Sequence, residues 1–250
     1  MSEAASVILA PPLPPTLPPN ASASTLLCDG LKVIRLDNFF SADECRSLID
    51  SLSPALPATD LRATSRRQRL QTDILEAPLI ETIWSRLCAA RALSPDTNEM
   101  LGTLTIDDDG EGLDGQWSAS HMRQRLLFAG YNSTDFYGAH YDLRVSEDGA
   151  SLPNGMEKDT GLRALLDVVS HVTIVLYLNE NGKDFVGGCT NILNGQKIIE
   201  SIAPTTGSAL LFLQEQVYHE GGAVQSGQKF ILRGDVLYRR CRTAEGGEGV

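Results

Sequence analysis

The chain has 250 residues, enough for one large β-type domain or two small ones with a buried core. Its 21 Lys and Arg against 32 Asp and Glu give a net charge of −11, which disfavours nucleic-acid partners. Five cysteines without regular spacing favour reduced thiols in an intracellular protein. The apolar stretch at residues 7–10 is too short for a signal peptide or a membrane span, so we expect no membrane association and a cytoplasmic location.

The N-terminal region is rich in Pro, Ser and Ala, most densely over residues 10–25. Such a tract cannot form a packed element, so residues 1–27 are expected to be a disordered leader. It could serve as a ligand for a proline-recognising domain or simply be an inert tail.

Two helices are predicted in the first half of the chain. The first begins at Ser41, because Glu44 stands three residues later in a capping-box arrangement. The second spans residues 78–93 and starts with a proline, which suits a first turn. Its apolar stripe consists of Leu79, Ile83, Leu87 and Ala90.

The second half of the chain has the pattern of a β-structure. From Arg125 onward, short apolar runs alternate with Gly, Asn and Asp clusters, which predicts a mainly β, double-stranded β-helix (jelly-roll or cupin-like) core over residues 120–240. The N-terminal helices are expected to buttress this core. Residues 107–115, rich in Asp and Gly, are expected to form a solvated loop rather than a calcium loop.

Residues 146–170 interrupt the β-pattern. The first half is loop-like, and residues 162–169 could form a short helix. A lid, a substrate-binding element and plain disorder all remain open for this insertion.

Three side chains have the composition of a metal site: His140, Asp142 and His219. Two imidazoles and one carboxylate leave coordination positions open, which is typical of non-haem Fe(II) oxygenases. On a strand, His140 and Asp142 would point to the same face. His219 follows the apolar run at residues 209–213, so we expect it at the end of a different strand. A chance His-x-Asp pair and a merely structural histidine are the alternatives.

A series of short motifs surrounds these residues in a fixed order. The series comprises Tyr131, Tyr137-Gly138-Ala139-His140-Tyr141-Asp142, residues 173–179, Gly187-Gly188-Cys189-Thr190, Ala203-Pro204, residues 207–212, His219 and Lys229. Residues 33–45 match an entry strand followed by a first helix. Over about residues 31–240 the chain thereby resembles the 2-oxoglutarate- and Fe(II)-dependent dioxygenases, specifically the prolyl 4-hydroxylase-like branch.

The resemblance implies a cofactor set and a role for several residues. It implies that residues 28–241 are a dioxygenase domain followed by a flexible tail, residues 242–250. His140, Asp142 and His219 would be the catalytic Fe(II) ligands, and O2 and 2-oxoglutarate the cosubstrates, with ascorbate as a reductant. Lys229 would bind the distal carboxylate of 2-oxoglutarate. Family positions also assign this cofactor-binding task to the hydroxyls of Tyr131, Tyr177 and Thr173, although the tyrosines could instead be core residues.

The reaction implied is hydroxylation, or a related oxidation, of an unactivated C–H bond, giving succinate and CO2. Halogenating relatives replace the carboxylate that Asp142 supplies here. The primary substrate is unknown, and the sequence carries no signal of oligomeric state. A free amino acid, a small natural product and a prolyl residue of a protein all remain open.

Lys229, Ile231, Arg233 and Asp235 share one face of the last predicted strand. Arg233, Asp235 and Tyr137 are therefore possible substrate-binding residues, unless Arg233 and Asp235 simply pair with each other. Collagen-type prolyl hydroxylases have an aromatic residue where Asp235 falls, which puts a collagen-like substrate in doubt.

Two other classes of protein would share parts of this pattern. A metal-binding cupin without oxygenase activity would need the triad but not Lys229 and its tyrosines. A catalytically inactive jelly-roll interaction module would be indicated by loss of a ligand, and none is lost. His121 and His171 lack this context and are expected to be structural.

Overall fold

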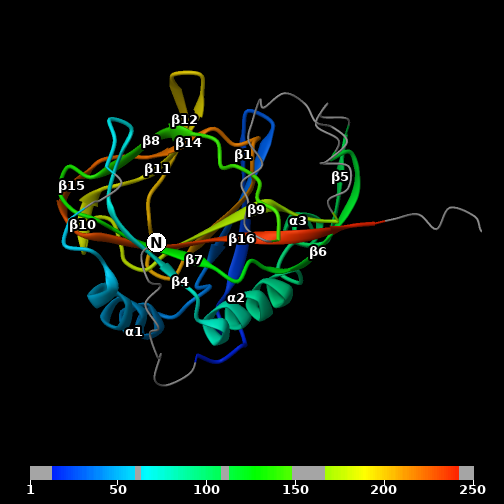
Figure 1. Ribbon diagram of the computed structural model, residues 1–250, viewed down its shortest axis with the longest axis horizontal. Coiled ribbons are helices and arrows are strands. Elements are labelled where there is room, and N and C mark those ends of the chain that lie inside the picture. Colours follow the sequence, from blue (N-terminus) through cyan, green and yellow to red (C-terminus); the bar gives the residue numbers. More distant parts are fainter. Residues whose placement is uncertain (1–12, 60–62, 108–112, 148–166, 242–250) are drawn as a thin grey trace, which may run out of the picture.

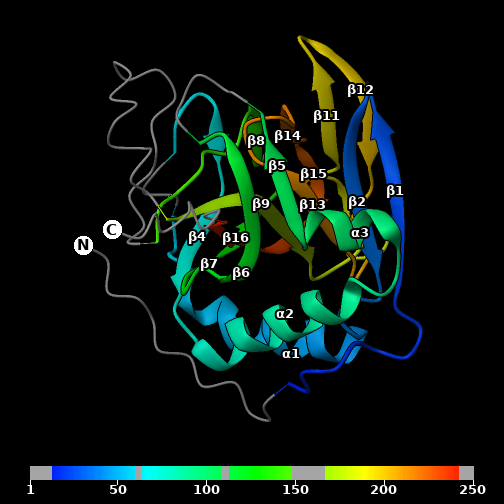
Figure 2. The ribbon, with the colours of Figure 1, turned by 90° about the vertical axis from the view of Figure 1, so that its right-hand side faces the viewer.

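The computed structural model describes residues 13–59, 63–107, 113–147 and 167–241. A nine-stranded and a five-stranded antiparallel sheet form the body of the protein, with a short two-stranded ladder at one end. In Figure 2, α1 and α2 lie below the larger sheet, α3 lies beside its strands, and the smaller sheet lies above. The expected mainly β jelly-roll core with N-terminal helices is confirmed.

The strands of the larger sheet (Figure 1) are, in spatial order, β1 (Ser22–Cys28), β2 (Leu31–Asp37), β13 (Ala209–Leu213), β9 (Val168–Tyr177), β16 (Lys229–Arg240), β6 (Gly115–Met122) and β5 (Thr103–Ile106). In addition, β7 (Leu126–Tyr131) pairs with the first part of β16, and β4 (Leu70–Ile74) pairs with β7. The smaller sheet contains β12 (Lys197–Ile202), β11 (Thr190–Asn194), β14 (His219–Gly221), β8 (Phe136–His140) and β3 (Arg67–Gln68). The ladder pairs β10 (Phe185–Gly187) with β15 (Val224–Gly227). The helices are α1 (Ala42–Leu52), α2 (Ala77–Ala90) and α3 (Pro95–Met100), with a 3-10 turn at Ser53–Ala55.

The central strand β9 of the larger sheet is buried on both faces. All ten residues of β9 are buried. Ile174 and Leu176 pack in the cluster that contains the helices, whereas Val175 and Tyr177 pack in the cluster that joins the sheets. Because successive side chains of β9 point to opposite faces of the sheet, the strand separates the hydrophobic core into two clusters. The cluster between the sheets is the one that surrounds the candidate site.

A buried ion pair fastens α1 to α2. Ser41 caps α1 with the expected capping box to Glu44. The fully buried Arg86 of α2 donates to both oxygens of Glu44, at 2.6 and 3.1 Å. Burial opposes ionisation of Glu44, but Arg86 and the Ser41 backbone outweigh it and lower the pKa of this carboxyl. α2 carries the predicted buried stripe and ends at Ala90, three residues earlier than expected.

The expectation of a disordered leader is wrong for part of residues 1–27. Ser22–Cys28 forms β1, which pairs with β2 through a two-residue turn at Asp29-Gly30. Both turn residues have positive φ, as a type I′ hairpin requires. Leu13 and Leu17 pack against the core, and the Pro14 carbonyl accepts from Arg86. Residues 1–12 and the tail, 242–250, lie outside the described residues.

The insertion falls largely outside the described part of the chain, since residues 148–166 are not placed. The helix predicted over 162–169 is wrong at its end, because Val168 and Val169 already belong to β9. Two consecutive buried valines suit a strand buried on both faces. No helix among the described residues is long and apolar enough to cross a membrane.

Glu44→Ala should lower the free energy of unfolding by about 3 kcal/mol, because it leaves the buried Arg86 guanidinium without its carboxylate. The measurement is chemical denaturation followed by circular dichroism. Asp43→Ala is the matched control, since Asp43 pairs with Arg46 on the exposed side of the same helix, and it should cost under about 1 kcal/mol. Equal losses in the two variants would contradict a structural role for the buried pair.

Candidate metal and cosubstrate site

The smaller sheet brings the three predicted ligands together. His140 is the last residue of β8, and His219 is the first residue of β14. These strands are antiparallel neighbours in which His219 and His140 are direct cross-strand partners. Asp142 lies two residues beyond β8, in the segment that leaves the strand rather than in the strand itself. One potential ligand atom from each residue lies within 4.8 Å of the other two.

Backbone carbonyls orient both imidazoles. His140 Nδ1 lies 2.9 Å from the Gly138 oxygen, and His219 Nδ1 lies 3.0 Å from the Val217 oxygen. A carbonyl can only accept, so each Nδ1 carries the hydrogen and each Nε2 keeps its lone pair for a metal. Burial lowers the pKa of His219, although Asp142 opposes the shift. The neutral imidazole that a metal requires is therefore favoured.

Asp142 divides its two oxygens between two tasks. Oδ1 lies 3.6 Å from His140 Nε2, on the side of the ligand atoms. Oδ2 accepts a 2.7 Å hydrogen bond from Thr173 and lies 3.2 Å from Nη2 of Arg233. Burial opposes ionisation, but Arg233 and the histidines hold the pKa of Asp142 well below its usual range. Two neutral imidazoles and one carboxylate form a donor set that fits a divalent iron.

Gln214 holds the partners of this carboxylate in place. Its amide nitrogen donates to Thr173 Oγ1 at 3.1 Å and to Asp235 Oδ1 at 2.9 Å. Its amide oxygen accepts from Ser170 at 2.6 Å. All of these groups are buried. Gln214 was not identified from the sequence, where its only signal is that a polar residue directly follows the apolar run of β13.

Lys229 lies with two of its three expected companions. It opens β16 and is the cross-strand partner of Tyr131 in β7. Its Nζ lies 5.3 Å from the ring centre of Tyr131 and 5.5 Å from that of Tyr177, and it donates to the Gly188 oxygen at 2.6 Å. Gly188 has φ +63°, and a Cβ there would come within 3.1 Å of the Lys229 side chain. Glycine therefore suits this position, where the backbone passes close to the aliphatic part of the Lys229 side chain.

The hydroxyls near Lys229 are already oriented. Tyr131 accepts from Arg69 at 2.6 Å, and Tyr177 shares a 2.6 Å hydrogen bond with Thr190. Burial lowers the pKa of Lys229 to about 7, with Cys189 opposing and Arg69 reinforcing the shift. An ammonium group in this environment favours an anionic ligand, which would compensate its burial.

The structure does not bring Thr173 to Lys229. Thr173 faces Asp235 across β9 and β16, six residues along β16 from Lys229, which is roughly 20 Å at strand spacing. Its hydroxyl binds Asp142 instead. The position of Thr173 therefore favours orientation of a metal ligand over contact with the distal carboxylate.

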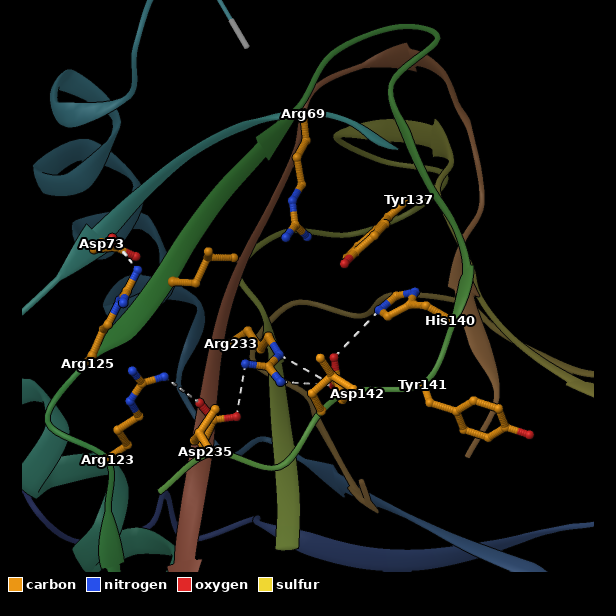
Figure 3. Close-up of a pocket in the computed structure, with 13 residues that line it drawn as sticks. Arg69, Asp73, Arg123, Arg125, Tyr137, His140, Tyr141, Asp142, Arg233 and Asp235 are labelled. Atoms are coloured by element: carbon orange, nitrogen blue, oxygen red, sulfur yellow. Dashed lines mark hydrogen bonds and ion pairs between the residues drawn. The ribbon is translucent and has the colours of Figure 1, made fainter. Parts of the chain in front are cut away.

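A cavity of about 360 Å³ opens beside the triad (Figure 3). Its lining includes His140, Asp142 and Tyr137, whose ring stacks on His140 with centroids 3.9 Å apart. Lys229, Tyr131 and Tyr177 are not part of this lining, so the candidate cosubstrate residues and the cavity are distinct regions around the triad.

Arg233 and Asp235 do pair with each other, at 2.9 Å, and both line the cavity. Asp235 also lies 3.5 Å from Arg123, and Arg233 also reaches Asp142. The mutual pairing of Arg233 and Asp235, one of the two alternatives left open by the sequence, is thus observed. Both residues nevertheless line the cavity.

The other two histidines take no part in the triad. His121 lies 3.4 Å from Glu147, and His171 is buried with its ring against Trp117 and Tyr238. Among the residues that the structure describes, the triad is the one group of His, Cys, Asp or Glu side chains arranged to hold a metal ion.

Thr173→Val keeps the shape of the side chain but removes the hydrogen bond to Asp142. Affinity for Fe(II), measured by titration without oxygen, should fall about 10- to 100-fold, the range seen when partners of metal ligands are lost. Affinity of the metal-saturated protein for 2-oxoglutarate should change far less. Thr190→Val is the matched control, because it removes the partner of Tyr177 and should weaken 2-oxoglutarate rather than iron. The reverse pattern would place Thr173 at the cosubstrate.

Comparison with known proteins agrees with this geometry. Residues 126–234, which contain the triad and Lys229, match the 2OG-Fe(II) oxygenase superfamily. No curated protein matches the sequence significantly.

Solved structures share the fold at low sequence identity. The viral collagen prolyl hydroxylase of Paramecium bursaria Chlorella virus-1, in complex with 2OG, superposes with a TM-score of 0.53 at 19% identity, covering 86% of this chain and 99% of that one. A prolyl-4-hydroxylase of Pseudomonas putida gives 0.51 at 17%, covering 89% and 95%. The prolyl hydroxylase of Trichoplax adhaerens, in complex with a hypoxia-inducible-factor peptide fragment, gives 0.51 at 18%, covering 82% of both chains.

Proposed function

We propose that the chain, whose residues 126–234 match the 2OG-Fe(II) oxygenase superfamily, is a 2-oxoglutarate-dependent dioxygenase that hydroxylates, or otherwise oxidises, an unactivated C–H bond of an amino-acid-like small molecule or a prolyl or peptidyl substrate. Succinate and CO2 would be the coproducts, and ascorbate the reductant that maintains the iron. The observation that carries the proposal is the triad of His140, Asp142 and His219 with the buried Lys229 nearby in the same core.

The triad residues would hold Fe(II) through His140 Nε2, His219 Nε2 and Asp142 Oδ1. The iron supplies the oxidising chemistry when it is bound with 2-oxoglutarate and O2. The protein contributes a fixed geometry: carbonyls fix the imidazoles, and Thr173 and Arg233 fix the carboxylate. Because Thr173 is buried and Arg233 is held between two carboxylates, the ligands need little reorganisation to bind the metal.

Lys229 would bind the distal carboxylate of 2-oxoglutarate, with Tyr131 and Tyr177 as hydroxyl donors. The Tyr131 oxygen accepts from Arg69, which leaves its own hydrogen available for a ligand. Burial raises the pKa of Tyr177, so its hydroxyl stays protonated and able to donate. A lysine supplies a point charge rather than a bidentate fork, and the hydroxyls would add direction to the contact.

The cavity beside His140 would receive the primary substrate. Its volume of about 360 Å³ suits a small molecule or one side chain of a peptide. The similar solved structures include prolyl hydroxylases, one described as acting on collagen and one bound to a hypoxia-inducible-factor peptide. The charged Asp235 at the cavity wall supports a substrate other than collagen.

Two competing functions are less well supported. A cupin without oxygenase activity, or an inactive interaction module, would have no use for a lysine that is only 3% exposed and lacks a carboxylate partner among the described residues. Such burial of a cation is costly and marks functional sites more often than structural ones. The net charge of −11 further supports partners other than nucleic acid or membrane, and the cysteine pattern supports a cytoplasmic location.

Purified protein given Fe(II), 2-oxoglutarate, ascorbate and O2 should form succinate, and candidate amino acids and prolyl peptides should stimulate this formation. His140→Ala and His219→Ala should abolish Fe(II) binding and succinate formation while the circular dichroism spectrum is preserved, because the core does not depend on the metal. His121→Ala is the control and should behave as wild type. Succinate formation that persists in either triad variant would refute the metal assignment.

Binding of 2-oxoglutarate should be linked to protonation of Lys229. Its pKa is about 7 in the free protein, and a bound carboxylate must raise this value. Above pH 7 binding should therefore take up a proton, and affinity should fall by up to about tenfold per pH unit. Below pH 7 the lysine is already charged, so affinity should level off. Calorimetry of the Fe(II) protein without oxygen, in buffers of different ionisation heat, measures both quantities.

Two variants separate charge from position in this prediction. Lys229→Ala should raise the Kd of 2-oxoglutarate at least tens of fold, the consequence of losing a charge-assisted bond worth about 2–5 kcal/mol. Lys229→Arg stays charged at every accessible pH, so any binding that it retains should show no proton uptake. An unchanged Kd in the alanine variant would place the cation elsewhere, with Arg233 the first candidate.

A further inference from the structure

The cavity beside the triad is rich in arginine, although the chain as a whole is acidic. Its lining contains four arginines, Arg69, Arg123, Arg125 and Arg233, and three aspartates, Asp73, Asp142 and Asp235. The whole chain has a net charge of −11. Since Asp142 would be committed to a divalent metal, the remaining cavity wall would be positively charged when the enzyme is loaded.

A series of ion pairs connects the metal ligand to the far wall of the cavity. Arg233 lies between Asp142 at 3.2 Å and Asp235 at 2.9 Å, and Asp235 lies 3.5 Å from Arg123. Figure 3 shows this series running from His140 to the end of the cavity where Arg123 and Arg125 lie. Guanidinium groups therefore extend from the reacting centre to the opposite end of the cavity.

Arg125 is the most exposed of the four cavity arginines. Its side chain is 41% exposed, whereas those of Arg123 and Arg233 are 16% and 23% exposed. Nη2 of Arg125 donates to Asp73 at 2.6 Å, and its other nitrogens have no partner among the described residues. Asp73 fixes one edge of the group, so the planar fork is already ordered for a second, bidentate partner.

We propose that the primary substrate is a small anion whose carboxylate binds Arg125 and Arg123, with the carbon to be oxidised directed toward His140 and Asp142. This inference rests on the proposed function and specifies its substrate class. An acidic or otherwise carboxylate-bearing amino-acid derivative matches the charge and the volume of about 360 Å³. The interior of a neutral peptide, which lacks a carboxylate, would leave these donors unused.

Matched acids and amides test the proposal directly. The probes are N-acetyl-L-proline, N-acetyl-L-leucine and N-acetyl-L-glutamate, each compared with its amide in which every carboxylate is replaced. Each is titrated calorimetrically into protein that holds Fe(II) and saturating 2-oxoglutarate, without oxygen. At least one acid should bind roughly tenfold or more tightly than its amide, as a charge-assisted hydrogen bond implies. Equal binding, tighter binding of the amides, or no binding of any acid at millimolar concentration would overturn the proposal.

Variants locate the anion within the cavity. Arg125→Gln and Arg123→Gln should each remove most of the preference for the acid, while affinity for the amide changes by less than about threefold. The double variant Asp73→Asn with Arg125→Gln removes both members of an ion pair and leaves no lone buried carboxylate, and it should show the same loss. Arg46→Gln, in an exposed arginine–aspartate pair on α1, is the control and should retain the preference. A preference that survives in all the cavity variants would overturn the proposal.

Two readouts separate this inference from the proposed function. Succinate formation by the wild-type protein without any added substrate tests the dioxygenase activity alone. The acid-to-amide preference is measured without turnover, and the titrations can be repeated without iron and 2-oxoglutarate. Turnover without an acid preference refutes the anionic substrate, whereas an acid preference without turnover refutes the proposed reaction and leaves the anion site standing.

Discussion

Asp142 has to remain ionised while it is buried, and it has to direct only one of its oxygens toward the metal. The structure meets both demands at Oδ2, where Thr173 donates a hydrogen bond and Arg233 supplies a positive charge. Both partners are themselves held, Thr173 by Gln214 and Arg233 by Asp235. The Asp142 carboxylate is thereby held in one orientation before a metal binds, with Oδ1 on the side of His140. Thr173, Arg233, Gln214 and Asp235 thus form one polar network with this carboxylate.

β16 carries both of the cations on which the site depends. Lys229 and Arg233 lie four residues apart, on one face of the strand and about 13 Å from each other. Their surroundings differ in one physical respect. Arg233 has carboxylates on both sides, and although burial opposes it, they raise its pKa, so that its charge is permanent. Lys229 has a carbonyl and two aromatic rings for neighbours, so burial brings its pKa to about 7. One strand thus supplies a structural charge and a charge that responds to a ligand.

Local periodicity predicted the parts of the site that depend on a single strand. The two-residue alternation placed Lys229, Arg233 and Asp235 on one face, and the capping box located the start of α1. Residues that depend on register between strands were missed. Gln214 joins the site because β13, β9 and β16 are aligned side by side, and Arg123 and Arg125 join it because β6 and β7, which they connect, both pair with β16. No local pattern encodes that alignment.

Two further differences have local explanations. Thr173 and Tyr177 lie four residues apart on the same face of β9, as predicted. Two hydroxyls on one face can still have different partners, and that of Thr173 binds Asp142. The Asp-Gly pair at residues 29–30 is typical of a two-residue hairpin turn, but the proline-rich composition before it led to the prediction of a disordered leader.

The acidic side chain at position 235 changes what the cavity wall can hold. An aromatic residue there would offer an apolar platform, which suits a ring such as that of proline. Asp235 instead joins Arg233, Arg123 and Gln214 in a buried polar network, where its charge is acceptable only because all three are present. If Asp235 alone were replaced by an aromatic residue, Arg233 would keep only Asp142 as a carboxylate partner, and Gln214 would lose an acceptor. The charged residues of this wall therefore depend on one another, because removing a single member leaves a charge of its partner uncompensated.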